Sequence, residues 1–261
     1  MKMQSPSAGN AARKLEGKVA IVTGGGQGVG RGIALAFAKE GARVVVAGRT
    51  AGTLGAVAEE LRQLGEESLD VVCDVSKEDQ VKHMVGESVK RFGQIDILVN
   101  NAQTLPPPLP LEEGDDAWWD AFFDSGPKGT WYCCKAVFPY MKGRGGKVIN
   151  LGSRAGLAGR HCVAYAGCKE AIRGFSRRAA MEWGKYNITV NVICPKVQSP
   201  AQIEWQRLNP EALKRELAER PISRHGDAEM DVGRTAVFLA SSDADFITGQ
   251  TLMVVGGEYM L

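Results

Sequence analysis

Three side chains in the second half of the 261-residue chain carry the strongest chemical signal. Tyr165 and Lys169 are four residues apart in a segment with helical spacing, so they share one face of the expected helix. A phenol with a pKa near ~10 is a poor acid–base group at neutral pH, and a neighbouring ammonium lowers that pKa by favouring the phenolate. Ser153, at the end of an expected strand, can hydrogen-bond a carbonyl oxygen as negative charge builds on it. The three residues predict proton transfer at a carbonyl or alcohol.

The spacing of Tyr165 and Lys169 alone is weak evidence, because such pairs are common on helix surfaces. Ser153, twelve residues upstream at a strand end, makes the combination much more specific. A serine hydrolase is a poor fit, since Ser153 does not lie in a G-x-S-x-G motif and no His–Asp pair follows in a recognisable setting.

A glycine-rich turn, "TGGGQGVG" at residues 23–30, joins the first expected strand to the first expected helix. Glycines let a backbone turn tightly and approach a pyrophosphate, and a helix N-terminus offers free N–H groups and partial positive charge. A tight turn also needs glycine, but this position in the first β-α-β unit favours nucleotide binding. The turn residues predicted to contact the cofactor are Gly24, Gln27, Gly28, Val29 and Gly30.

The end of the second expected strand, "VVVAGRT", indicates which cofactor is used. An enzyme that binds the ribose 2′-hydroxyl of NAD needs an acidic residue near this point, and the chain has none. Arg49 can instead pair with a 2′-phosphate through charge-assisted hydrogen bonds. We therefore favour NADP(H) over NAD(H), with a solvated surface arginine as the alternative.

Short apolar runs alternate with helical segments along the chain. Strands are expected at residues 18–24, 43–48, 68–75, 95–102, 146–153, 188–195 and 251–257. Helices are expected at residues 29–41, 50–65, 77–93, 115–142, 164–186 and 227–241. The near-continuous Val, Ile and Leu of the strands is typical of a parallel sheet covered on both faces. We predict one doubly wound α/β domain at residues 15–261, with a mainly parallel seven-stranded sheet and helices on both faces, after a disordered tail at residues 1–14.

Composition argues against several other classes of protein. The net charge is +2, with 32 basic and 30 acidic residues, so there is no electrostatic argument for binding nucleic acid or a membrane surface. The apolar runs are too short to span a bilayer. Six cysteines without C-x-x-C spacing and three scattered histidines predict reduced thiols, no metal site and a cytoplasmic location. Residues 1–14 lack the apolar core of a secretory signal, and a transit peptide is the weaker alternative to a tail.

The ordered motifs resemble the short-chain dehydrogenase/reductase family, of the type that includes 3-oxoacyl-acyl-carrier-protein reductases. The resemblance covers the chain from Leu15 onward. It rests on "TGGGQGVG", "CDV" with Asp74, "NNA" at residues 100–102, Ser153, "YAGCK" and "VNVICP". It implies a Rossmann-like fold, a nicotinamide cofactor, reversible hydride transfer to or from a small-molecule carbonyl or alcohol, and a homotetramer or homodimer.

The resemblance also implies a role for each matching residue. Tyr165 would be the general acid/base, Lys169 would lower its pKa and hold the nicotinamide ribose, and Ser153 would steady the substrate oxygen. Further cofactor contacts would come from Asp74, Val75, Asn101, Ala102, Gln103, Pro195 and Val197. Two matches are imperfect, because Gln103 and Lys196 stand where the family has glycine.

The largest departure is Gly126, which replaces a helix-kinking asparagine of the family and precedes Pro127. Proline has no N–H, so the carbonyl of Phe123, four residues back, is expected to be free to bind a water. One hypothesis is that Gly126 and Pro127 keep the kink and a water-mediated proton relay to Lys169. The alternative is a packing kink with a weakened relay.

The substrate is barely encoded. Candidate pocket residues are Gln103, the "LPPPLP" loop at residues 105–110, Arg154, His161 and Trp205, with a lid-like excursion at about residues 198–219. An NADP(H)-preferring reductase or dehydrogenase is the favoured function. The alternatives are a catalytically silent cofactor-binding protein on the same fold, and a lyase or epimerase that uses the same tyrosine.

Overall fold

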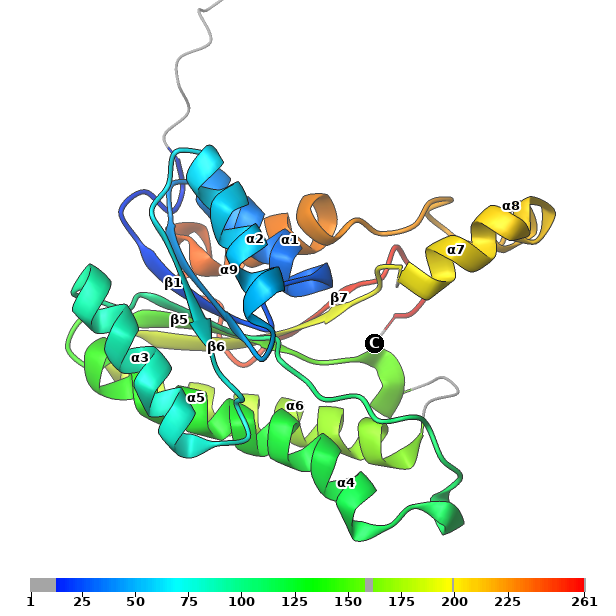
Figure 1. Cartoon of the computed structure of the whole chain (residues 1–261), viewed down its shortest axis with the longest axis horizontal. Helices are drawn as coiled ribbons and strands as arrows, with labels where there is room; N and C mark the ends of the chain where they lie inside the picture. Colours follow the sequence, from blue (N-terminus) through cyan, green and yellow to red (C-terminus); the bar gives the residue numbers. More distant parts are fainter. Residues whose placement is uncertain (1–12, 158–161, 199, 261) are drawn as a thin grey trace, which may run out of the picture.

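One parallel sheet organises the molecule, and its strand order is β3-β2-β1-β4-β5-β6-β7 (Figure 1). The computed structural model describes residues 13–157, 162–198 and 200–260, except the side chains of residues 200–202 and 205. The strands are β1 (Val19–Thr23), β2 (Arg43–Gly48), β3 (Ser68–Val72), β4 (Ile97–Asn100), β5 (Gly146–Leu151), β6 (Ile188–Pro195) and β7 (Thr251–Val254). Every neighbouring pair is parallel, which confirms the predicted seven-stranded, doubly wound sheet.

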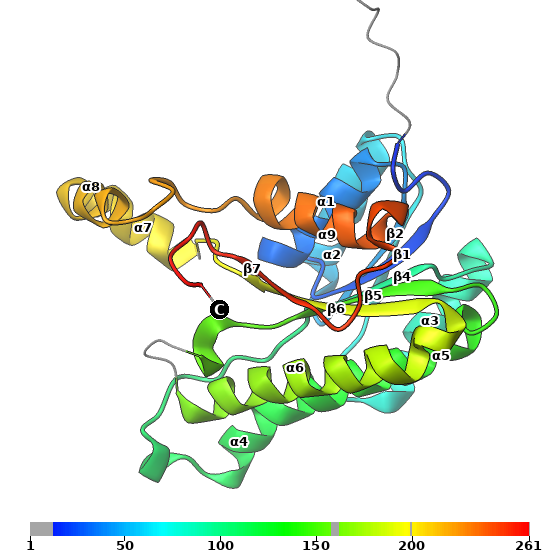
Figure 2. The same ribbon diagram turned by 180° about the vertical axis from the view of Figure 1, so that it is seen from behind.

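Helices cover both faces of the sheet (Figures 1 and 2). One layer consists of α1 (Gly28–Lys39), α2 (Ala51–Gln63) and α9 (Arg234–Ala240). The other consists of α3 (Glu78–Phe92), α5 (Gly129–Met141) and α6 (Val163–Trp183), extended by α4 (Asp116–Phe123). Because alternate strand residues point to opposite faces, the apolar strands feed two separate buried clusters, one under each layer. Within the described residues, no helix combines the length and apolarity needed to cross a membrane.

Two expected helices contain π turns. The predicted helix at residues 115–142 is α4, a π turn η2 (Asp124–Lys128) and α5, so the chain stays helical through Pro127. The predicted helix at residues 227–241 is a π segment η5 (Ala228–Gly233) followed by α9. The remaining short helices are η1 (Leu111–Glu113), η3 (Arg154–Gly156), η4 (Gly184–Tyr186) and η6 (Ser242–Ala244).

The excursion at residues 198–219 forms two helices, α7 (Pro200–Leu208) and α8 (Pro210–Ala218), which project away from the sheet (Figure 1). At the other end of the chain, residues 1–12 of the predicted tail lie outside the described residues. Its last residue, Lys14, is among the described residues: its ammonium pairs with Asp243 at 2.5 Å and its backbone N–H donates to Glu40.

The α1 helix packs against η5 through small residues. A Cβ atom added to Gly32 would lie 2.4 Å from the backbone carbon of Ala228. A Cβ atom added to Gly233 would lie 2.7 Å from the Cβ atom of Ala36. Glycine at these positions therefore lets two helical backbones approach more closely than any other residue would allow.

We expect Gly32→Ala to lower the free energy of unfolding by about 1–3 kcal/mol, because the added methyl group meets backbone that cannot move aside. The matched control is Gly86→Ala in α3, where an added Cβ atom meets nothing within 4 Å. There the higher helix propensity of alanine should raise the free energy of unfolding by about 0.5–1 kcal/mol. Urea denaturation measures both values, and equal effects at the two sites would contradict the close packing of α1 on η5.

Candidate active site

The strand order reverses between β1 and β4, and side-chain hydrogen bonds join the ends of these two strands. The Thr23 hydroxyl accepts the backbone N–H groups of Asn101 and Ala102 at 3.0 and 3.1 Å. The Asn101 amide donates to the carbonyls of Thr23 and Gly24 at 2.9 and 3.1 Å. Ligands of open α/β sheets bind at such a reversal, outside the carboxyl ends of the strands.

The glycine-rich turn follows β1 at this point. Gly24 has a left-handed φ of +64°, and an added Cβ atom would lie 2.6 Å from the Asn101 amide nitrogen. At Gly30, an added Cβ atom would lie 2.2 Å from the Gly24 carbonyl oxygen. Gln27 precedes α1 without capping it through its side chain, so the first N–H groups of α1 remain available to an anion. This cradle fits a pyrophosphate.

A cleft opens over the turn and the ends of β2, β3 and β4. Of the residues predicted to bind the cofactor, those that line it are Gly24, Gln27, Arg49, Asp74, Val75, Ala102 and Gln103. Gly28, Val29 and Gly30 form the first turn of α1, and Asn101 holds the glycine-rich turn. Pro195 ends β6 and Val197 pairs with Gly226, and neither lines this cleft.

Eight lining residues were missed by the sequence analysis: Gly26, Gly48, Thr50, Thr53, Leu54, Cys73, Thr104 and Ser125. The sequence offered a signal for one of them, because Thr50 places a hydroxyl group directly beside Arg49. Arg49 is exposed, and no ion pair involves it within the described part of the chain. Asp74 is fixed on the opposite side, because its carboxylate accepts the Ser76 N–H and hydroxyl at 3.0 and 2.8 Å.

Ser153, Tyr165 and Lys169 come together where β5 ends and α6 begins. The Ser153 hydroxyl is hydrogen-bonded to the Tyr165 phenol and also accepts the Ala155 N–H at 3.1 Å. The buried Lys169 ammonium lies 5.7 Å from the centroid of the Tyr165 ring and donates to the Leu151 carbonyl at 2.9 Å. The predicted trio therefore lies in one place, at the carboxyl edge of the sheet.

The pKa values of Tyr165 and Lys169 respond mainly to burial. Burial raises the pKa of Tyr165, and the hydrogen bond from Ser153 acts in the opposite direction. Burial also lowers the pKa of Lys169. The expectation that Lys169 lowers the pKa of Tyr165 stays a prediction, because desolvation raises that pKa in this structure and the Lys169 ammonium donates to Leu151.

The π turn spans Pro127, and its wider pairing lets the helix continue past a residue without an N–H. The neighbouring Phe122 carbonyl accepts the Gln103 amide at 3.0 Å and the Cys168 thiol at 3.4 Å. The free carbonyl of Phe123 and the water relay to Lys169 stay predictions.

An ion-pair network holds the C-terminal tail of the chain. Lys196, which stands where the family has glycine, pairs with Glu258 at 2.5 Å, and Arg220 pairs with the same carboxylate at 2.9 Å. The Tyr259 hydroxyl donates to the Leu157 carbonyl at 3.3 Å. The C-terminal tail is thereby held against both the α7–α8 excursion and the segment that follows Ser153.

The other candidate pocket residues are only partly described. Arg154 lies in η3 directly after Ser153, and the 105–110 loop follows the cleft residue Thr104. His161 lies outside the described residues, as does the side chain of Trp205.

Comparison with known proteins adds independent findings. The family model described as enoyl-(acyl carrier protein) reductase matches residues 24–258. A 12α-hydroxysteroid dehydrogenase from Clostridium sp. is 44% identical over 253 residues, which cover 93% of this chain and 97% of the relative. A 3-oxoacyl-acyl-carrier-protein reductase from Staphylococcus epidermidis is 38% identical, with 93% and 99% covered. Among solved structures, a 7α-hydroxysteroid dehydrogenase complexed with NADH and 7-oxo glycochenodeoxycholic acid is 32% identical with a TM-score of 0.86, and 94% of this chain and 96% of that chain are covered.

We expect Ser153→Ala to raise the pKa of Tyr165 further, because the hydrogen bond that favours its phenolate is lost. Phenolate absorbance is titrated with pH in the wild type and in Ser153→Ala, and the same titration of Tyr165→Phe is subtracted to isolate Tyr165. A Tyr165 midpoint that stays in place or falls would show that Ser153 does not donate to this phenol.

Proposed function

The chain belongs to the short-chain dehydrogenase/reductase family and is an NAD(P)(H)-dependent oxidoreductase of secondary alcohols and ketones, and from this premise we propose that it prefers NADP(H) and uses Tyr165 as its general acid/base. The observation that carries the proposal is the meeting of Ser153, Tyr165 and Lys169 beside the nucleotide cradle. The relatives give no support to a silent cofactor-binding protein or to a lyase or epimerase.

In the proposed mechanism, the bound nicotinamide supplies or accepts the hydride at the substrate carbon. During reduction, Tyr165 gives its phenolic proton to the substrate oxygen, and during oxidation the phenolate takes that proton back. Ser153 hydrogen-bonds the same oxygen and stabilises the charge that develops on it. Lys169 holds the nicotinamide ribose, and its ammonium offsets the charge of the phenolate.

The preference for NADP(H) is supported by the cleft wall at the end of β2. Arg49 lines the cleft, and no ion pair engages its guanidinium in the described part of the chain. The neighbouring hydroxyl groups of Thr50 and Thr53 also line the cleft. A planar guanidinium with several donors is suited to a dianionic 2′-phosphate.

For the substrate we propose a hydroxyl or ketone on a bulky apolar skeleton, of the hydroxysteroid type. The 44% identity to a 12α-hydroxysteroid dehydrogenase supports this class. Three exposed apolar side chains also support this class. Leu105 lies in the loop that follows the cleft residue Thr104, Val163 lies at the start of α6, and Met260 lies in the C-terminal tail. The α7–α8 excursion would act as a lid over such a substrate.

We further propose a cytoplasmic homotetramer, or a homodimer. An apolar groove between α5 and α6, lined by Trp131, Phe138 and Trp183, supports an interface between copies of the chain. The protein would form one domain from Leu15 onward.

We expect Tyr165→Phe to reduce NADPH-dependent turnover by about 10²–10⁴-fold, because the proton donor is removed while the ring remains. NADPH consumption is followed with oxo-steroids, 3-oxoacyl thioesters and simple ketones, and fluorescence titration checks that the variant still binds NADPH. Turnover confined to acyl thioesters would contradict the proposed substrate class, and an active Tyr165→Phe enzyme would contradict the proposed role.

We expect Arg49→Leu to weaken NADPH binding by about 10–100-fold and to leave NADH binding unchanged, because only NADPH carries the 2′-phosphate. The matched control is Arg62→Leu in α2, the helix that follows Arg49. Arg62 pairs with Glu59 and does not line the cleft. Equal losses for both cofactors would show that Arg49 does not read the phosphate.

A further inference from the structure

The carbonyl group of Phe122 is a buried acceptor beside the π turn. Phe122 is 1% exposed, and the π turn that follows it contains Pro127, which has no N–H. A buried carbonyl needs a hydrogen-bond donor. The Gln103 amide provides that donor at 3.0 Å, and the Cys168 thiol adds a weaker contact at 3.4 Å.

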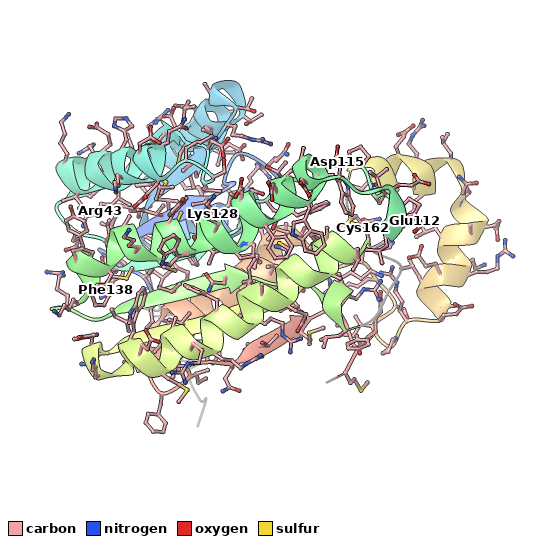
Figure 3. The ribbon with its side chains drawn as sticks, turned by 90° about the horizontal axis from the view of Figure 1, so that it is seen from below. Arg43, Glu112, Asp115, Lys128, Phe138 and Cys162 are labelled. Atoms are coloured by element: carbon pink, nitrogen blue, oxygen red, sulfur yellow. The ribbon has the colours of Figure 1, made fainter. Side chains whose placement is uncertain are left out.

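The carboxamide of Gln103 joins three parts of the molecule. Its nitrogen also donates to the Ser125 hydroxyl at 3.2 Å, and its oxygen faces the Cys168 thiol at 3.5 Å. It therefore connects the segment after β4 with the π turn and with α6. In Figure 3, α4 and α5 run beside α6, with Lys128 at the end of the π turn and Cys162 at the start of α6.

Gly126 provides the space that this arrangement needs. A Cβ atom added there would lie 2.4 Å from the Cys168 sulfur and 2.9 Å from the Gln103 carboxamide oxygen. Both distances are far below van der Waals contact. Any side chain at position 126 would therefore displace Cys168, the Gln103 carboxamide, or both.

We propose that Gln103 is a positioning residue, which fixes the first turns of α6, and with them Tyr165 and Lys169, against the cofactor cleft. Gln103 lines that cleft, while Cys168, which it contacts, lies between Tyr165 and Lys169 in α6. Gly126 is the other half of the arrangement, because its lack of a side chain makes room for the carboxamide and for the Cys168 sulfur. The proposal rests on the proposed function for the reaction that this positioning serves.

The test uses Gln103→Met in the full-length protein. Methionine keeps the length of glutamine but has no N–H donor. We expect Gln103→Met to lower kcat about tenfold, the effect of one lost hydrogen bond, while NADPH affinity changes less than about twofold.

Amide hydrogen exchange of α6 is measured on the wild type and on Gln103→Met as a readout independent of turnover. Faster exchange in the first turns of α6 in Gln103→Met is the expected result. An unchanged kcat in Gln103→Met, or an unchanged exchange of α6, would overturn the proposal and leave Gln103 as a cleft-lining contact. If the wild type turns over none of the substrates, the proposed function fails, and the exchange pattern alone decides the positioning role.

A second arm tests the space around Gly126. We expect Gly126→Ala to lower kcat by about tenfold or more, because α6 must shift to admit the methyl group. Cys168→Ala removes the sulfur that lies 2.4 Å away, so the double variant should recover activity relative to Gly126→Ala. The matched control is Gly174→Ala in α6, where an added Cβ atom meets nothing within 4 Å and kcat should not change. A Gly126→Ala enzyme with full activity would overturn the proposal.

Discussion

The hydrogen bonds that join the ends of β1 and β4 are the constraint on which the site depends. The Thr23 hydroxyl and the Asn101 amide lock these two strand ends together at the reversal of strand order. Because all the strands are parallel, every connection that leaves a carboxyl end emerges at the same edge of the sheet. The glycine-rich turn, the Arg49 segment and the Ser153 segment are therefore neighbours, although they lie far apart in the sequence.

Burial sets the acid–base character of the site, and it acts in opposite directions on the two ionisable groups. It raises the pKa of Tyr165 and lowers that of Lys169, so it favours the neutral form of both side chains. Their hydrogen bonds then decide the balance, with Ser153 stabilising the phenolate and the Leu151 carbonyl holding the ammonium. Burial thus moves the pKa of the amine toward neutral pH and the pKa of the phenol away from it.

The sequence predicted those features that local patterns determine. The Val- and Ile-rich runs predicted all seven strands, and the motifs predicted seven of the residues that line the cleft, as well as the Ser153–Tyr165–Lys169 group. The sequence did not predict that the helix would continue from α4 through Pro127 as a π turn. Nor did it predict the contact of Gln103 with Phe122, because that contact depends on how two segments nineteen residues apart pack in three dimensions.

The ion pairs of Glu258 have a practical consequence for handling the protein. This carboxylate joins Lys196 to Arg220, and the next residue, Tyr259, bonds to the Leu157 carbonyl. Glu258 and Tyr259 are thus held against three other segments of the chain. An affinity tag, a reporter fusion or a surface linkage attached after them would lie next to these contacts, one of which is to the segment that follows Ser153.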